Sequence, residues 1–278
     1  MESVVRNRIS NGRTCMDYND FKEHILTEGL LTFNNFYNQN EVNDIRSLAQ
    51  FSKPIKGSAL DGRWYHAYYK PDEWEDNINW AHYWTDQNKH EPVIQHAIAK
   101  VNPIINSILG NDWTLWCSDY HVTCGGSKYI QPHIDNPYGH KPWELEMDLV
   151  SLQMLIAVDD FTIDNGGTAY VPRSHAMQFD LNTNSLDLTN YLLLHNTQFT
   201  GKAGSMIVYH PRTLHTTMPN NSPDTRHALL FSAVKNEIID QLKHYDRDCN
   251  VFEGTQGIAF KERIKEVGWE EALEERLE

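Results

Sequence analysis

The amino-acid sequence predicts a mainly β protein with flanking helices, built as a two-sheet jelly roll or a related sandwich. Two features indicate this fold: about eight short β-type runs follow one another after Asp112, and turn residues such as Gly and Asn separate them. A length of 278 residues, of which 40% are hydrophobic, provides a sizeable core. We therefore expect a single domain over residues 1–278.

The first part of that domain, residues 1–111, is expected to be mostly helical. In the predicted second helix, Asn38 is followed three residues later by Glu41, which is the pattern of a capping box. Pro103 is expected to interrupt the third helix, because proline removes a backbone hydrogen bond. Segment 57–90 lacks a clear periodicity and is expected to be mainly loop. The predicted helices span residues 18–31, 38–49 and 91–109.

The second part, residues 112–235, is expected to form the jelly-roll core. Gly125 and Gly126 predict a turn at the end of its first strand. The remainder, residues 236–278, is expected to be a helical tail, because apolar residues recur at helical spacing on an acidic background between 260 and 278. The predicted strands span residues 113–124, 129–134, 149–158, 168–171, 195–200, 205–209, 214–218 and 228–234.

Charge and hydropathy narrow the classes of partner. Thirty-eight acidic and 24 basic residues give a net charge of −14, which repels phosphate backbones and makes a nucleic-acid partner unfavourable. The N-terminal residues lack the apolar core of a signal peptide, and the longest apolar run, Met154–Val158, is too short to cross a membrane. We expect a soluble, cytoplasmic protein without a membrane partner.

One pair of residues in the core has the spacing of metal ligands. His133 and Asp135 lie two positions apart, so on a strand or at its end both side chains project from the same face. His244 and Asp246 have the same spacing, but no histidine follows them to supply a third ligand. We interpret the second pair as surface residues and the first as part of a candidate metal site.

Several segments, taken in order, resemble the phytanoyl-CoA dioxygenase family of iron(II)- and 2-oxoglutarate-dependent oxygenases. The most distinctive is the middle one, where that family commonly shows an N-G-x…P-x-S-H pattern. The segments are Gly29–Leu48, the pair His133 and Asp135, Asp164–Thr168 through Pro172–His175, and finally His215 with Arg226 eleven positions later. Together they extend over most of the chain.

The resemblance implies a double-stranded β-helix in which His133, Asp135 and His215 bind iron. Two imidazoles and one carboxylate on one face leave coordination positions open for 2-oxoglutarate and dioxygen, an arrangement that suits non-haem Fe(II). Arg226 would then bind the distal carboxylate of 2-oxoglutarate, because its planar fork matches a carboxylate bidentately. Thr217, two positions from His215 and on the same strand face, would add a hydrogen bond to that carboxylate.

Other residues near these positions have alternative interpretations. His210 competes with His215 as third ligand, but it lies between Tyr209 and Pro211, in the context of a turn at a strand end. His175 is interpreted as a structural hydrogen-bonding residue at a turn. The aromatic residues between 64 and 84 are interpreted as core packing, with a lid over the site as the alternative.

Substrate contacts are expected from loops at the mouth of the barrel. Tyr138, His140 and Trp143 follow the metal pair, and Arg173 lies in the middle segment. Plain surface packing is the alternative for the first three residues, and a solvated turn is the alternative for Arg173. Neither the identity of the substrate nor the oligomeric state can be predicted from the sequence.

The most consistent prediction is an Fe(II)- and 2-oxoglutarate-dependent dioxygenase that hydroxylates a small organic molecule and releases succinate and carbon dioxide. A carboxylate at Asp135 argues for hydroxylation, because halogenating relatives carry a small residue there. One alternative is a non-enzymatic jelly-roll protein that binds a metal or ligand, although a purely structural metal would not require Arg226. Another is an oxygenase that acts on a nucleobase or a protein side chain.

Overall fold

The computed structural model describes residues 9–10, 15–16, 20–51, 80–84, 91–123, 125–126, 132, 134–135, 149–177 and 191–237. Contacts between residues divide the chain into two compact units, one of residues 1–54 with 79–236 and the other of residues 55–78 with 237–278. Every described residue except Glu237 belongs to the first unit. The predicted C-terminal helical tail and most of the aromatic segment 64–84 lie outside the described residues.

Helices form the early part of this unit, and the first of them is shorter than expected. The α-helices are α1 (Phe21–Glu28), α2 (Gln39–Arg46) and α3 (Pro92–Leu109), and short 3-10 helices cover Ser47–Phe51 and Ser174–Ala176. The prediction that the first helix continues to Leu31 was wrong, because Gly29 adopts a left-handed conformation (φ 84°) that ends it. The chain then continues directly into strand β3 (Leu30–Phe33).

The capping box predicted for α2 is confirmed. The side chain of Asn38 accepts a hydrogen bond from the backbone N–H of Glu41 (3.1 Å), and the carboxylate of Glu41 accepts one from the backbone N–H of Asn38 (2.7 Å). In contrast, Pro103 does not interrupt α3, which is continuous from 92 to 109. The buried residues Ile104 and Ile105 anchor that turn in the core, so packing offsets the hydrogen bond that proline removes.

Each predicted strand except 129–134 coincides with an observed strand, and four observed strands were not predicted. Of segment 129–134, only residues 132 and 134 are described. The unpredicted strands are β1 (Ile9–Ser10), β2 (Cys15–Met16), β3 and β4 (Trp80–Trp84); β4 falls in the segment that was expected to be loop. The remaining strands are β5 (Trp113–Thr123), β6 (Ser151–Ala157), β7 (Thr168–Tyr170), β8 (Thr197–Gln198), β9 (Met206–Tyr209), β10 (His215–Thr217) and β11 (Arg226–Lys235).

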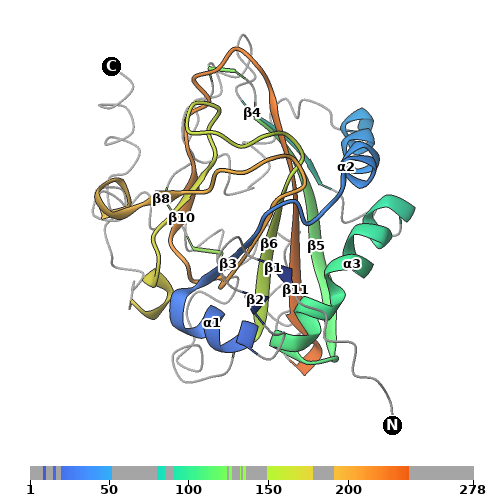
Figure 1. Cartoon of the computed structure of the whole chain (residues 1–278), viewed down its shortest axis with the longest axis vertical. Helices are drawn as coiled ribbons and strands as arrows, with labels where there is room; N and C mark the ends of the chain where they lie inside the picture. Colours follow the sequence, from blue (N-terminus) through green and yellow to red (C-terminus); the bar gives the residue numbers. More distant parts are fainter. Residues whose placement is uncertain are drawn as a thin grey trace, which may run out of the picture. The chain divides into compact units, whose positions relative to one another are not determined.

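The strands form two facing sheets and a small separate pair. A six-stranded sheet has the order β3-β9-β6-β11-β5-β4, a three-stranded sheet has the order β10-β7-β8, and β1 pairs with β2. Every pairing of neighbouring strands is antiparallel. Helices α2 and α3 lie on one side of the six-stranded sheet, and β8 and β10 lie on the other (Figure 1).

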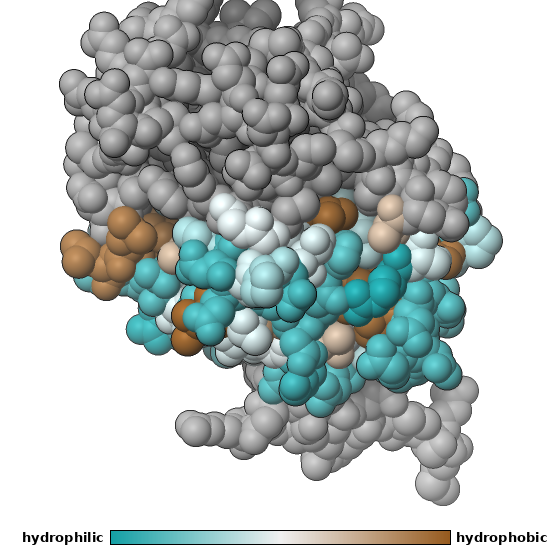
Figure 2. Space-filling model, turned by 90° about the horizontal axis from the view of Figure 1, so that it is seen from above, coloured by the Kyte–Doolittle hydropathy of each residue, from teal (hydrophilic) through white to brown (hydrophobic). Residues whose placement is uncertain are grey.

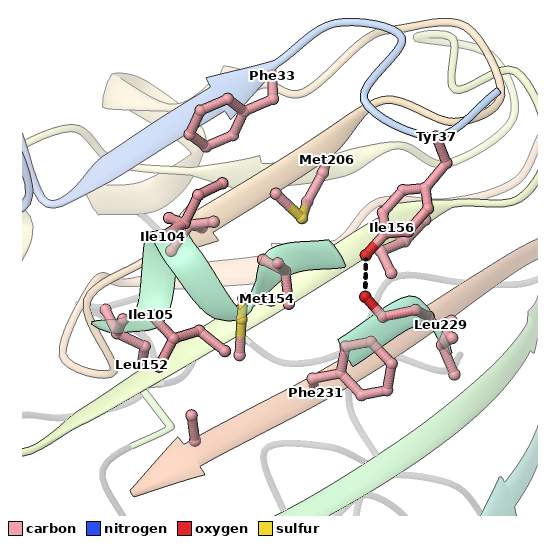
Figure 3. Close-up of a cluster of buried hydrophobic side chains, with 14 of the residues drawn as sticks. Phe33, Tyr37, Ile104, Ile105, Leu152, Met154, Ile156, Met206, Leu229 and Phe231 are labelled. Carbon is pink, nitrogen blue, oxygen red and sulfur yellow. Dashed lines mark hydrogen bonds between the residues drawn. The ribbon is translucent and has the colours of Figure 1, made fainter. Parts of the chain in front are cut away.

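Alternation along the strands divides the core into two parts. Met154 and Ile156 of β6 point toward the helices, where α3 contributes Ile104 to the same cluster (Figure 3). The hydroxyl of Tyr37 closes this part by donating a hydrogen bond to the carbonyl of Ala97 (2.8 Å; Figure 3).

The strand residues that alternate with Met154 and Ile156 point to the opposite face of the six-stranded sheet, away from the helices. Leu155 of β6 and Ile207 and Tyr209 of β9 join Tyr170 of β7 in a second cluster between the two sheets. Because successive side chains of a strand project to opposite faces, the six-stranded sheet is buried on both sides. The space between the sheets is the interior of the roll.

The surface of the described residues is largely polar. Figure 2 shows one face of the molecule on which hydrophilic residues predominate among those described and apolar ones form only small groups. No helix in the described part of the chain is both long enough and apolar enough to cross a membrane. Among the described residues, the exposed large hydrophobic side chains are Leu26, Ile163, Leu193 and Leu194.

Candidate functional site

The strand register places three of the predicted site residues on the interior face of the roll. His215 of β10 lies directly opposite Tyr170 of β7, a member of the cluster between the sheets, so both side chains share that face. Thr217 is two residues further along β10 and has the same orientation. Arg226 begins β11 two residues before Ala228, which belongs to the same interior cluster.

The structure brings Asp135 and His215 together. Nε2 of His215 lies 3.3 Å from Oδ2 of Asp135, and both side chains are largely buried, with 9% and 12% of their surface exposed. Nδ1 of His215 lies 2.9 Å from the carbonyl oxygen of Thr213. Because a carbonyl only accepts hydrogen bonds, Nδ1 carries a hydrogen, so in the neutral imidazole the lone pair of Nε2 would face the carboxylate.

A nitrogen lone pair facing a carboxylate oxygen requires a positive charge between them. Burial tends to lower the pKa of His215, but the adjacent Asp135 carboxylate outweighs it and raises the pKa above its usual value. A divalent metal ion meets the same requirement, since two ligands about 2.1 Å from one ion and roughly at right angles lie about 3 Å apart. Asp135, His215 and the Thr213 carbonyl therefore fit one side of a metal centre, with the carbonyl fixing the tautomer of the histidine.

The third predicted ligand, His133, lies outside the described residues. Within the described part of the chain, no group of three or more His, Cys, Asp or Glu side chains is placed to hold a metal ion. The role of His133 as a metal ligand stays a prediction. The same is true of substrate contacts by Tyr138, His140 and Trp143, which are also outside the described residues.

Sequence reasoning missed one residue of this site, Tyr209. Its hydroxyl donates a hydrogen bond to Oδ2 of Asp135 (3.0 Å), and its ring centroid lies 5.0 Å from that of His215. Tyr209 is the last residue of β9 and is 4% exposed. In the sequence it is indistinguishable from any aromatic residue at the end of a buried strand, so no local signal marks it.

Arg226 lies in an environment that suits an anionic ligand. The residue is 3% exposed, its Nη2 donates to the Thr123 hydroxyl (2.7 Å), and its guanidinium carbon lies 4.3 Å from the centroid of the Phe161 ring. Burial lowers the pKa of Arg226 to about 10, and attraction to Asp159 partly opposes that shift, so the guanidinium stays charged at neutral pH. Its buried Nε has no hydrogen-bond partner within the described residues.

A second buried polar atom, which has no hydrogen-bond partner among the described residues, is linked to this guanidinium through two phenylalanines. Thr168 of β7 is directly opposite Thr217 of β10, and the Thr168 hydroxyl makes no hydrogen bond to any described residue. The Thr168 carbonyl accepts from the backbone of Phe199 (2.7 Å), and the Phe199 ring lies 5.8 Å from that of Phe161 beneath Arg226. Buried donors of this kind normally have partners, so the region fits a bound carboxylate such as that of 2-oxoglutarate.

The middle segment of the sequence, residues 164–175, connects the strand that carries His215 to its neighbours. The hydroxyl of Ser174 donates to the carbonyl of Val171 (2.7 Å) and accepts from the backbone N–H of Leu214 (2.8 Å), the residue before His215. Gly166 has φ 76°, and a Cβ there would lie 2.4 Å from the carbonyl oxygen of Met218, just after β10. Both contacts set the position of β10 and hence of His215.

The competing histidines take structural positions. His210 accepts a hydrogen bond at Nδ1 from the backbone of Arg212 (3.1 Å), and its ring lies 5.0 Å from that of His175. Burial lowers the pKa of His210 to about 3, with further lowering by His175 and Arg212, so it is neutral at pH 7. Nε2 of His175 lies 2.9 Å from the carbonyl of Leu26, within hydrogen-bonding distance. In the described structure the residue beside Asp135 is His215.

Arg173 forms an ion pair at the surface. Its Nε and Nη2 donate to the two carboxylate oxygens of Glu28, at 2.9 and 2.7 Å. The Arg173 side chain remains 69% exposed. A contact of Arg173 with substrate stays a prediction.

The fold is shared with solved 2-oxoglutarate-dependent enzymes. The non-heme alpha ketoglutarate dependent carbocyclase SnoK from nogalamycin biosynthesis is 17% identical, over 82% of this chain and 86% of SnoK, with a TM-score of 0.59. EctD from S. alaskensis, solved with 2-oxoglutarate and 5-hydroxyectoine, is 16% identical over 83% of this chain and 82% of EctD, with a TM-score of 0.59. HygX from Streptomyces hygroscopicus, solved with nickel, 2-oxoglutarate and hygromycin B, is 14% identical over 77% of this chain and 86% of HygX, with a TM-score of 0.57. These similarities confirm the predicted mainly β, jelly-roll fold.

Family membership follows from the sequence itself. No curated protein matches the sequence. The family model of phytanoyl-CoA dioxygenase (PhyH) matches residues 26–228, well over half of the chain, and includes Asp135, His215 and Arg226. The chain therefore belongs to the phytanoyl-CoA dioxygenase family and is a 2-oxoglutarate-dependent oxygenase.

Proposed function

We propose that the chain is an iron(II)- and 2-oxoglutarate-dependent dioxygenase that hydroxylates a small organic molecule and releases succinate and carbon dioxide. In this proposal His133, Asp135 and His215 hold the iron. The observation that carries it is the close approach of His215 Nε2 to Oδ2 of the Asp135 carboxylate, at 3.3 Å in a buried site, with Nδ1 held by the Thr213 carbonyl. This geometry suits two ligands of one cation. When bound, iron would activate dioxygen, with 2-oxoglutarate decarboxylated to succinate as the source of two electrons.

The residues of the chain would orient 2-oxoglutarate between this site and Arg226. The guanidinium would bind the distal carboxylate with the charged, planar donor set that such a group prefers. Thr217 would add its hydroxyl from the same strand face as His215. Among the described residues, the Nε of Arg226 and the hydroxyl of Thr168 have no hydrogen-bond partner, and this supports the location because both buried donors would gain an acceptor.

The burial of the site would keep water away from it. Phe161, Phe199 and Tyr170 surround the interior with apolar surface, and each is at most 9% exposed. A dry interior strengthens the attraction between Arg226 and a carboxylate, because the effective dielectric constant is lower than in water. It also protects a strongly oxidising centre from side reactions.

A small-molecule substrate is favoured over a macromolecule. The solved structures of EctD and HygX contain 5-hydroxyectoine and hygromycin B, respectively, both of which are small molecules. The net charge of −14 disfavours binding of nucleic acid. Hydroxylation is favoured over halogenation because Asp135 supplies a carboxylate at the metal pair.

Turnover of 2-oxoglutarate tests this proposal. Purified protein incubated with Fe(II), oxygen and 2-oxoglutarate is expected to form succinate slowly even without its substrate. His215→Ala is expected to abolish both this reaction and metal binding, whereas the matched variant His210→Ala should bind metal as the wild type does. If the wild-type protein binds metal but forms no succinate, it is a binding protein rather than an enzyme.

A further inference from the structure

Tyr209 contacts both members of the Asp135–His215 pair. We infer that Tyr209 is a positioning residue for the metal centre, which aims the Asp135 carboxylate at the ion through its hydroxyl. This inference rests on the proposed function, because it assumes that Asp135 and His215 share a metal ion. Neither the sequence motifs nor the family resemblance pointed to Tyr209.

The contact is directed at the oxygen atom that faces the site. The Tyr209 hydroxyl lies 3.0 Å from Oδ2 of Asp135, the same atom that lies 3.3 Å from Nε2 of His215. A neutral hydroxyl that donates to this oxygen limits rotation of the carboxylate about its Cβ–Cγ bond. The Tyr209 ring, tilted by 60° against the imidazole at a centroid distance of 5.0 Å, also packs against the second ligand.

Asp135 needs such support because neither it nor its described neighbours lie in a helix or strand. The described residues 132, 134 and 135 belong to no helix or strand. Ile134 packs against the cluster formed by Ala169, Val171, Leu192 and Leu214, so it anchors the backbone beside β10. That contact leaves the direction of the neighbouring carboxylate to be set by side chains.

Tyr209 is itself held rigidly. It ends β9, which is hydrogen-bonded to β3 on one side and to β6 on the other, with Tyr209 opposite Leu30 and Gln153. The residue is 4% exposed and belongs to the apolar cluster between the sheets. A hydroxyl on a fixed strand can therefore impose its geometry on a loop residue, which is how groups beyond the metal ligands tune metal sites.

The test is the affinity of the protein for Co(II), measured by titrating the metal-free protein and following the visible absorption of the bound ion. Tyr209→Phe is expected to weaken Co(II) binding by about 10- to 100-fold, the usual effect of losing a group that orients a ligand. It should also shift the visible absorption bands, because the Asp135 carboxylate loses its fixed orientation.

Tyr170→Phe is the matched control. Tyr170 lies in the same interior cluster and directly opposite His215, and no hydrogen bond from its hydroxyl to Asp135 is found in the described structure. This variant should bind Co(II) within about twofold of the wild type. An equal loss in both variants would mean that the hydroxyls act through general packing, and wild-type affinity in Tyr209→Phe would overturn the inference.

If Tyr209→Phe folds poorly, a substitution that keeps the hydroxyl can still test the inference. Replacing Tyr209 by 3-fluorotyrosine retains the ring and the hydroxyl but makes the hydroxyl a stronger donor. The Co(II) bands are then expected to shift while the melting temperature of the metal-free protein is unchanged; unchanged bands would overturn the inference. A wild-type protein that binds no Co(II) would instead contradict the proposed function as a whole.

Discussion

At the scale of single residues, Arg226 carries its positive charge at a buried position, and burial disfavours the charged form of a side chain. The side chain is 3% exposed and has one hydroxyl acceptor, Thr123, and one aromatic face, Phe161, among its described contacts. A buried charge without a paired anion is costly. The arrangement would become favourable if a carboxylate entered, which supports the proposal that Arg226 binds 2-oxoglutarate.

Replacing the guanidinium tests this role. Arg226→Lys keeps the charge but loses the planar fork, so the KM for 2-oxoglutarate is expected to rise roughly 10- to 100-fold, equivalent to one charge-assisted hydrogen bond. The measurement is the rate of succinate formation against 2-oxoglutarate concentration. Arg173→Lys, at an exposed ion pair with Glu28, should leave this KM unchanged. An unchanged KM in Arg226→Lys would place the co-substrate elsewhere.

At the scale of elements, the junction between α1 and β3 holds the turn between β9 and β10, which leads into His215. Gly29 lies at this junction, and its carbonyl accepts hydrogen bonds from the backbone of His210 (2.8 Å) and the hydroxyl of Thr213 (2.9 Å). Thr213 in turn orients His215 through its own carbonyl. A glycine is required here because φ is 84° and a Cβ would lie 2.5 Å from Nδ1 of His175.

Glycine is needed at position 29 for two reasons, the positive φ and the lack of space for a Cβ, and two substitutions can separate them. Gly126 has a similar φ of 82°, but a Cβ there would meet no atom within 4 Å. Gly126→Ala is expected to cost about 1 kcal/mol of unfolding free energy from backbone strain alone. Gly29→Ala should cost about 2–4 kcal/mol, because the clash with His175 adds to that strain. Urea unfolding measures both, and equal losses would show that the close packing around Gly29 contributes nothing.

The hydrogen bonds and ion pair that join α2 to β11 through Asp159 stabilise the fold to an extent that depends on pH. Asp159 accepts hydrogen bonds from the backbone and ring of His227 on β11, both at 2.7 Å, and forms an ion pair with Arg46 at the end of α2. Burial tends to raise the pKa of Asp159, but the bonds from His227 and Arg46 outweigh it, so the pKa lies below its usual value. The resulting stabilisation is present above the pKa of the unfolded state, near 4, and is lost as the pH falls through the lower pKa of the folded state.

Acid unfolding of a variant measures this contribution. Between about pH 5 and pH 2, the wild type is expected to lose about 2 kcal/mol more unfolding free energy than Asp159→Asn, which has no carboxylate to protonate. Glu28→Gln, at an exposed ion pair with Arg173, serves as the control and should follow the wild type closely. If Asp159→Asn showed the same dependence on pH as the wild type, the network would not stabilise the junction of α2 and β11.

Local sequence signals predicted the elements whose structure depends on near neighbours. The capping box of Asn38 and Glu41 and the alternating strands of the core are of this kind. Strand β4 was missed because it forms by pairing with β5, and no pattern within Trp80–Trp84 requires that partner. Pro103 was misjudged because tertiary packing, which the sequence does not display, holds α3 together.

At the scale of the whole molecule, the candidate site joins segments that are far apart in the chain. Tyr209 and Asp135 are separated by 74 positions, and Arg226 and Thr123 by 103. The ordered motifs identified Asp135, His215 and Arg226, because each motif carries its own chemistry. Tyr209 and Phe161 could not be found this way, since their roles arise only when the two sheets face each other. Thr168 lies within a motif, but nothing in the motif marks its hydroxyl.

A crystal structure of the protein with Fe(II) and 2-oxoglutarate, grown without oxygen, tests directly whether Asp135 and His215 share one iron, because anomalous scattering locates the metal. One iron is expected within about 2.3 Å of a carboxylate oxygen of Asp135 and of Nε2 of His215, with His133 as third ligand. The distal carboxylate of 2-oxoglutarate should contact Arg226. An iron bound elsewhere, or Asp135 and His215 on separate ions, would contradict the proposed site.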